Sequence, residues 1–184
     1  MCQFKSAIYL ASGKILWLKN EDSHEKILAA HKIEDKDLPA DFVKIECVPQ
    51  ENPKDIFNWK FIVDMSDDEL PDWWNDGHAK TAEKAIRDIV AENYIFIDKT
   101  LAEVDSNGYF YDCKIGSIAG GEQWLRDTST IETVSGGEQL LHDNSTIGTV
   151  SGGRQELWGN STIETVSGGE QWLHDNSKII KKEE

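Results

Sequence analysis

The sequence predicts a small α+β domain followed by a β-solenoid, a coiled stack of strands also called a β-helix. Three observations support this fold class. A 16-residue segment recurs through the C-terminal part of the chain, short β-rich runs and two helical runs precede it, and 184 residues suffice for two small domains. We assign residues 1–98 to the α+β domain and 99–184 to the solenoid, with about four and a half to five coils.

The first domain is predicted to have the element order ββαββα. FKSAIYL and ILWL form a hairpin, and strands are expected over 42–48 and 56–64, because β-branched and aromatic residues favour strands. DSHE at 22–25 resembles a capping box that opens a short helix, and an amphipathic helix is expected near 79–92. An acidic loop, 64–77, precedes this last helix.

The repeat determines the architecture of the second domain. From Ile115 the copies read IGSIAGGEQWLRDTST, IETVSGGEQLLHDNST, IGTVSGGRQELWGNST and IETVSGGEQWLHDNSK. Helical-hairpin repeats need about 33 residues, so a 16-residue period favours one solenoid coil. Ile, Val and Thr favour strands, while Gly-Gly and Asp-Asn mark turns. LAEVDSNGYFYDCK, residues 101–114, is interpreted as a shortened first coil.

Identical residues in one column of the repeat are expected to stack inside the solenoid. These columns hold Ile at position 1, Ile or Val at position 4 and Leu at position 11. Gln at position 9 and Ser at position 15 share the inward parity, and their polar groups, about 4.8 Å apart, can hydrogen-bond along the axis. The charged ending IIKKEE would blunt an open strand edge.

The outward positions 8, 10 and 12 mix aromatic and charged residues, which is typical of a contact surface. The predicted partner-binding residues there are Trp124, Leu140, Trp158, Trp172, Glu122, Glu138 and Glu170. A homo-oligomer through the solenoid is expected, with a dimer favoured, because a regular sheet can pair with its two-fold copy. The alternative is that these Trp residues pack on the first domain or shield the sheet.

The acidic loop is a second candidate for partner binding. It contributes Asp67, Asp68, Glu69, Trp73 and Trp74. The loop does not match a calcium-binding pattern, which needs alternate Asp or Asn residues before a Gly and a Glu after it. Its Trp pair either packs into the core or anchors a partner.

The formal net charge of −15 disfavours direct nucleic-acid and membrane binding and suits a basic partner, including a nucleic-acid-binding protein. The start of the chain does not resemble an export signal, and no apolar run is long enough for a membrane span. Three cysteines without metal-ligand spacing favour a reducing cytoplasm.

No combination of nucleophile, base and orienting group can be identified, so we expect no enzyme activity, no catalytic residue and no cofactor. We also expect no metal site, because His24, His31 and His78 lack ligand-like spacing. Two alternatives remain open. Cys2 could become an N-terminal nucleophile after removal of the initiator Met, with the solenoid as scaffold or oligomeriser, or the solenoid could be purely structural.

MCQFKSAI at the start, LPDWW at 70–74, YDCKIGSI at 111–118 and the repeats together resemble a group of small phage and mobile-element proteins. Those proteins combine an N-terminal α+β domain with a C-terminal short-repeat β-solenoid. The resemblance brings no activity with it. It implies a phage-type binding or inhibitor protein, located in the cytoplasm of a host cell, that blocks a host protein or defence complex through an acidic, Trp-bearing surface.

Overall fold

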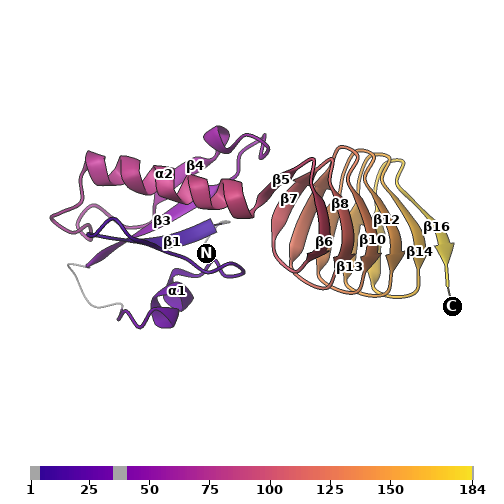
Figure 1. Ribbon diagram of the computed structural model, residues 1–184, viewed down its shortest axis with the longest axis horizontal. Coiled ribbons are helices and arrows are strands. Elements are labelled where there is room, and N and C mark those ends of the chain that lie inside the picture. The colour runs from indigo at the N-terminus through magenta and orange to yellow at the C-terminus, as the bar shows by residue number, and fades with distance from the viewer. Residues whose placement is uncertain (1–4, 35–40, 184) are drawn as a thin grey trace. The chain divides into compact units, whose positions relative to one another are not determined.

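The computed structural model describes residues 5–34 and 41–183. The chain forms two compact units, Met1–Asn93 and Tyr94–Glu184. The first unit contains a small sheet with helices, and the second is a β-solenoid (Figure 1). The predicted fold class is therefore confirmed.

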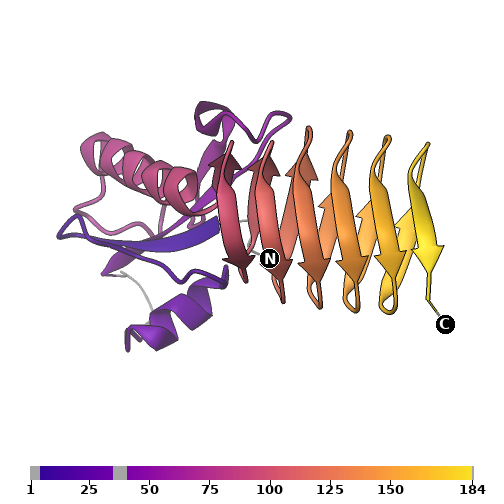
Figure 2. The ribbon, with the colours of Figure 1, turned by 45° about the vertical axis from the view of Figure 1, so that its right-hand side comes forward.

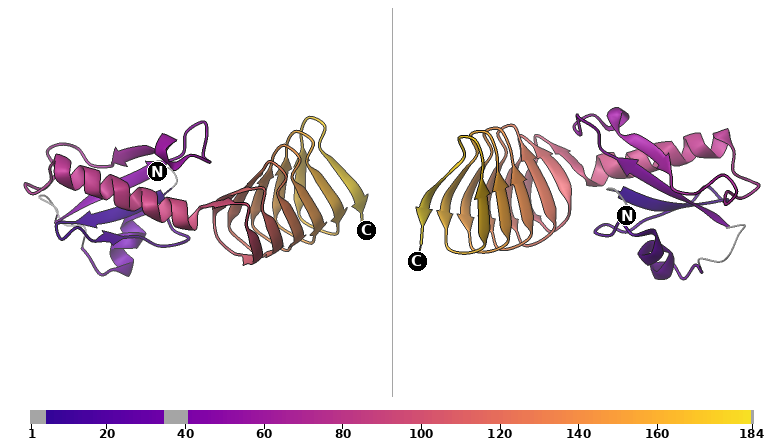
Figure 3. Two further views of the ribbon diagram at one scale, coloured as in Figure 1. Left: turned by 45° about the horizontal axis from the view of Figure 1, so that its top comes forward. Right: turned by 180° about the vertical axis from the view of Figure 1, so that it is seen from behind.

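The first unit is built on a four-stranded antiparallel sheet with the order β2-β1-β3-β4. Helices α1 and α2 lie on opposite faces of this sheet (Figures 1 and 3), and the buried Ala82, Ile86 and Val90 line the inner side of α2. The elements are β1 (Lys5–Leu10), β2 (Ile15–Leu16), α1 (His24–Ala30), β3 (Phe42–Val48), β4 (Lys60–Val63) and α2 (Asp76–Asn93).

Two local details differ from the sequence prediction. The cap of α1 is Ser23, whose side chain accepts a hydrogen bond from the Lys26 amide, and the helix begins at His24. The expected strand over 56–64 begins with a 3₁₀ turn, η1 (Ile56–Asn58), and only its second half forms β4. The Asp55 carboxylate accepts from the Phe57 amide at 3.0 Å, and such a cap favours a turn over a strand.

The solenoid consists of two six-stranded parallel sheets whose strands alternate along the chain, as the stacked coils in Figure 2 show. One sheet contains β5 (Ile95–Ile97), β7 (Gly108–Tyr111), β9 (Glu122–Arg126), β11 (Glu138–Leu141), β13 (Arg154–Leu157) and β15 (Glu170–Leu173). The other contains β6 (Thr100–Val104), β8 (Lys114–Ile118), β10 (Thr130–Val134), β12 (Thr146–Val150), β14 (Thr162–Val166) and β16 (Lys178–Lys182).

The solenoid starts with β5, before residue 99, and this strand lacks the Gly-Gly and Gln of the repeat. Its register pairs Phe96 with Phe110, and the two rings stack with centroids 4.8 Å apart. The shortened coil over 101–114 is present as predicted, because Leu101 and Val104 pair with Ile115 and Ile118. The coils before the clean repeats are therefore shorter but keep the same inward columns.

The inward columns form the solenoid core. Residues of the columns at positions 1, 4 and 11 are buried in one cluster: Ile115, Ile131, Ile147, Ile163, Ile118, Val134, Val150, Val166, Leu125, Leu141 and Leu157. Leu173 in the last coil is 43% exposed, because it has a neighbouring coil on one side only. In the edge strand β16, Lys182 takes the column that holds Val166 in the coil before, which places a charge at the open edge.

The buried glutamines form a continuous amide ladder along the axis. Gln139 Nε2 donates to Gln123 Oε1 at 2.9 Å, Gln155 Nε2 to Gln139 Oε1 at 2.9 Å, and Gln171 Nε2 to Gln155 Oε1 at 3.1 Å. The serine column behaves differently, since the Ser129 hydroxyl donates to the backbone carbonyls of Phe110 and Arg126. Ser161 and Ser177 also donate to backbone carbonyls, so of these two buried columns it is the glutamines that link side chain to side chain.

The Gly-Gly corner leaves no room for a side chain. Gly137 has a φ of 81°, and a Cβ atom added there would lie 2.6 Å from the carbonyl oxygen of Gly121 in the preceding coil. Gly120, in the first copy, does not have a positive φ, and a Cβ atom added there would meet no other atom within 4 Å. The corner glycine is needed because of both its backbone conformation and its contact with the preceding coil.

We predict that Gly137→Ala destabilises the solenoid by about 2–5 kcal/mol, from roughly 1–2 for the left-handed backbone and roughly 1–3 for the clash. Gly120→Ala is the matched control, and we expect its stability to stay close to that of the wild type. Urea unfolding followed by circular dichroism measures both variants. Equal unfolding midpoints for the two variants would contradict this account of the corner.

Candidate functional site

The candidate site is the outer surface of strands β9, β11, β13 and β15, which we call the aromatic face. It is defined by the outward residues Glu122, Trp124, Arg126, Glu138, Leu140, His142, Arg154, Glu156, Trp158, Glu170, Trp172 and His174. The parallel register places Trp124, Leu140, Glu156 and Trp172 next to one another across the strands. The predicted apolar group is therefore interrupted by Glu156.

Arg154 organises the centre of the aromatic face. Its guanidinium contacts Glu138 at 2.8 Å and Glu156 at 3.5 Å, which joins β11 and β13. The same group lies over the Trp172 ring at 3.9 Å, so it also reaches β15. The planar guanidinium of an Arg stacks well on an aromatic ring while its edge pairs with carboxylates. The Arg154 side chain therefore connects outward residues of three neighbouring strands.

Trp158 lies in the neighbouring column, between two histidines. The rings of Trp158 and His174 stack with centroids 3.7 Å apart, and those of His142 and Trp158 stack at 6.3 Å. His174 Nε2 also lies 3.2 Å from the Glu156 carboxylate. Trp158 is half-buried as a result, and it acts as the middle of a three-ring stack.

Exposure differs among the four predicted apolar contact residues. Trp124, Leu140 and Trp158 are half-buried, and Trp124 stacks on the buried Tyr109 with centroids 4.7 Å apart. Trp172 is 44% exposed, and its indole Nε1 donates to Glu170 at 2.9 Å. The face is therefore a braced surface with one well-exposed aromatic ring.

The acidic-loop residues lie in the first compact unit and form a separate group. Asp67 and Asp68 are exposed, while Glu69 accepts a hydrogen bond from the Ser66 amide, which lowers the pKa of Glu69. Trp74 lies edge-on to the buried Tyr9 with centroids 5.7 Å apart. Trp73 is likewise half-buried and contacts the same tyrosine ring. The Trp pair thus packs against its own domain, and partner binding by this loop stays a prediction.

No protein-family model, curated protein or solved structure matches this chain. The resemblance to phage and mobile-element proteins is therefore supported only in its two-part architecture. Of the described helices, neither α1 nor α2 combines the length and the apolar character that a membrane span requires.

The described cysteines are poor nucleophiles. Burial raises the pKa of the Cys47 thiol to about 12 and also raises the pKa of the Cys113 thiol. A thiol with a raised pKa stays protonated at neutral pH, whereas nucleophilic attack needs the thiolate. Cys2, the proposed N-terminal nucleophile of the alternative enzyme hypothesis, lies outside the described residues.

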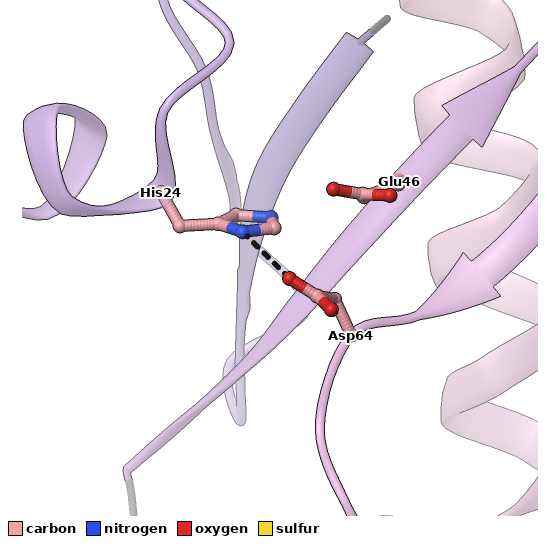
Figure 4. Close-up of side chains that lie close together, drawn as sticks. All are labelled: His24, Glu46 and Asp64. Carbon is pink, nitrogen blue, oxygen red and sulfur yellow. Dashed lines mark ion pairs between the residues drawn. The ribbon is translucent and has the colours of Figure 1, made fainter. Parts of the chain in front are cut away.

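One group of potential ligands was missed by the sequence analysis. His24, Glu46 and Asp64 come from three different elements of the first unit, and their donor atoms lie within 4.8 Å of one another (Figure 4). Chain spacing offers no signal for this group, because 22 residues separate His24 from Glu46 and 18 separate Glu46 from Asp64.

His142 is a residue of the aromatic face whose pKa is shifted by its surroundings. Burial lowers its pKa below the ordinary 6.5, Arg126 acts in the same direction, and Asp143 and Glu156 oppose them. We predict an NMR titration midpoint below 6.5 for His142, and a rise of this midpoint in Arg126→Gln. Lys178→Gln, which removes a cation that is not among the causes of the shift, is the control.

The lowered pKa of His142 also makes the unfolding free energy depend on pH, because proton binding is linked to folding. A histidine with a lowered pKa binds its proton more readily in the unfolded chain, so its contribution to stability is full above the unfolded-state pKa of about 6.5. That contribution is lost as the pH falls below this value. The pH dependence of the unfolding free energy should therefore be shallower in His142→Gln, and an unchanged slope would show that His142 is not the responsible group.

Proposed function

We propose that this protein is a non-enzymatic binding protein that docks a protein partner on the aromatic face of its solenoid. The observation that carries this proposal is that the Trp172 ring is both exposed to solvent and held in place by its neighbours. The ring is 44% exposed, yet Arg154 stacks on it at 3.9 Å and Glu170 binds its indole nitrogen at 2.9 Å. Trp and Arg are enriched among the residues that dominate binding energies at protein interfaces.

The rigidity of this arrangement supports the same proposal. Binding costs free energy whenever a mobile side chain has to be fixed, and a side chain that is already fixed avoids much of this cost. Arg154 is held by Glu138 and Glu156, and the backbone below it is hydrogen-bonded to a strand on either side. The aromatic face thus offers a preorganised aromatic and guanidinium pair on a flat support.

Charge indicates the kind of partner. The aromatic face carries Glu122, Glu138, Glu156 and Glu170 against Arg126 and Arg154, on a chain of net charge −15. Such a surface attracts basic proteins and repels nucleic acid, and the attraction mainly raises the association rate. That the partner is a host protein, a nucleic-acid-binding protein or a defence complex, met in the host cytoplasm, stays a prediction from composition and resemblance.

A second copy of the chain is the other candidate for this surface. The predicted dimer would use the aromatic face, since a two-fold axis could place Arg154 of each copy near the glutamates of the other. This dimer stays a prediction. Measuring the mass of the isolated protein in solution separates self-association from binding to another protein.

The experiment compares Trp172→Ser with the wild type as bait. Phe57→Ser is the matched control, because Phe57 is an exposed aromatic residue, 83% exposed, in the other unit. Burying one Trp at an interface is worth about 2 kcal/mol or more, so Trp172→Ser should weaken partner binding roughly 30-fold. Capture from the host lysate identifies the partner, titration calorimetry measures the affinity, and light scattering reports the mass of each bait alone.

Loss of binding in Trp172→Ser, with Phe57→Ser and the melting temperature unchanged, would support the proposal. Loss of a dimer mass in Trp172→Ser would assign the aromatic face to self-association. Equal binding by all three proteins would overturn the proposal and direct attention to the acidic loop with Asp67, Asp68 and Glu69.

A further inference from the structure

Three residues of the first unit converge although they are far apart in the sequence. His24 is the first residue of α1, Glu46 lies in the middle of β3, and Asp64 follows the end of β4 (Figure 4). Strand β3 pairs with β4 through Glu46 and Ile62, and the Asp64 amide donates to the Lys44 carbonyl at 2.9 Å. This extra hydrogen bond continues the pairing beyond β4 and positions the Asp64 carboxylate beside that of Glu46.

The hydrogen bonds of His24 determine which ring nitrogen faces the carboxylates. Its Nε2 lies 3.1 Å from the carbonyl oxygen of Ile45, and a carbonyl can only accept, so Nε2 carries a proton. Its Nδ1 lies 3.2 Å from Asp64 Oδ2. A neutral ring with a proton on Nε2 presents a lone pair at Nδ1, and the carboxylate also presents lone pairs. The lone pairs of Nδ1 and Oδ2 repel each other at this distance unless a cation lies between them. That cation is either a proton on Nδ1 or a metal ion.

The arrangement matches the surroundings of a metal-bound histidine. Histidines that bind a metal through one nitrogen almost always donate the other N–H to a carbonyl or carboxylate, which fixes the ring. Ligand bonds of about 2.0–2.2 Å place neighbouring ligand atoms roughly 3 Å apart around one ion. The distance of 3.2 Å between Nδ1 and Oδ2 fits this geometry, and all three donor atoms lie within 4.8 Å of one another.

Burial and donor type restrict the ion. His24 and Glu46 are each 4% exposed, whereas the Asp64 side chain is 53% exposed, so an ion would have a route from solvent and room for water ligands. One imidazole nitrogen with two carboxylates suits Zn²⁺ or Mn²⁺. Ca²⁺ prefers six to eight oxygen ligands and is a poor match for this set.

We propose that His24 Nδ1, Glu46 and Asp64 bind one divalent first-row transition-metal ion of the Zn²⁺ and Mn²⁺ type. The bound ion links α1 to β3 and to the end of β4, which are the elements that supply the ligands. The proposal is independent of the aromatic face, because all three ligands belong to the first compact unit.

The test uses the full chain after treatment with EDTA. CoCl2 serves as the optical probe, because Co²⁺ bound by nitrogen and oxygen ligands absorbs visible light differently from free Co²⁺. ZnCl2, MnCl2 and CaCl2 are then compared by their effect on the melting temperature, since an ion that binds only the folded state raises it. Asp64→Asn is the ligand variant, and we expect it to fold because the Asp64 side chain is half-exposed. Asp67→Asn, an exposed residue of the same acidic loop, is the matched control.

The expected result is saturable binding of one Co²⁺ per chain, displaced by Zn²⁺, with affinity at least about tenfold weaker in Asp64→Asn and unchanged in Asp67→Asn. The melting temperature should rise with ZnCl2 or MnCl2 and much less with CaCl2. Equal weakening in both variants would overturn the proposal, because it would show nonspecific attraction to an acidic chain. A proton on Nδ1 in the nitrogen NMR spectrum that ZnCl2 does not displace would also overturn it, in favour of a simple ion pair.

Discussion

The in-register stacking of identical coils is the constraint on which the rest of the solenoid depends. The register of a strand in such a sheet is fixed by its buried side chains, since a shift by one residue moves every inward side chain outward. Here the glutamine ladder reinforces the register, because the amide groups of Gln139, Gln155 and Gln171 each donate to the Gln in the same column of the preceding coil. The Gly-Gly corner adds a second requirement, as Gly137 rests against the backbone of the coil before it.

The properties of the aromatic face follow from this register. Glu138, Arg154 and Glu170 share one column, so the change from Glu to Arg in the third copy places a cation between two acidic neighbours. The position of Arg154 then allows its stacking on Trp172, and Trp158 in the next column meets His174 in the same way. Substitutions within an otherwise uniform repeat are therefore where the solenoid acquires individual chemistry.

The repeat predicted the solenoid because identical columns reveal the register directly, and the buried Gln and Ser columns were correctly placed inside. The earliest strand, β5, was not predicted, since IFI shares the apolar pattern of the coils but none of their turn residues. The contacts of Arg154 could not be predicted, because the columns of the repeat give the register of the strands but not the conformation of an outward side chain. His24, Glu46 and Asp64 could not be grouped, because only the pairing of β3 with β4 and the docking of α1 bring them together.

The central claim is that the register of whole coils holds the solenoid together, and deletion of one coil tests it most directly. Removal of residues 147–162 deletes one complete 16-residue copy and joins Thr146 to Ile163 in the original register. Removal of residues 147–154 deletes half a copy and would place the Gln155 strand where β12 should lie. Thermal unfolding followed by circular dichroism should show one cooperative transition for the whole-coil deletion and loss of the solenoid for the half-coil deletion. Equal melting temperatures for the two deletions would contradict the account.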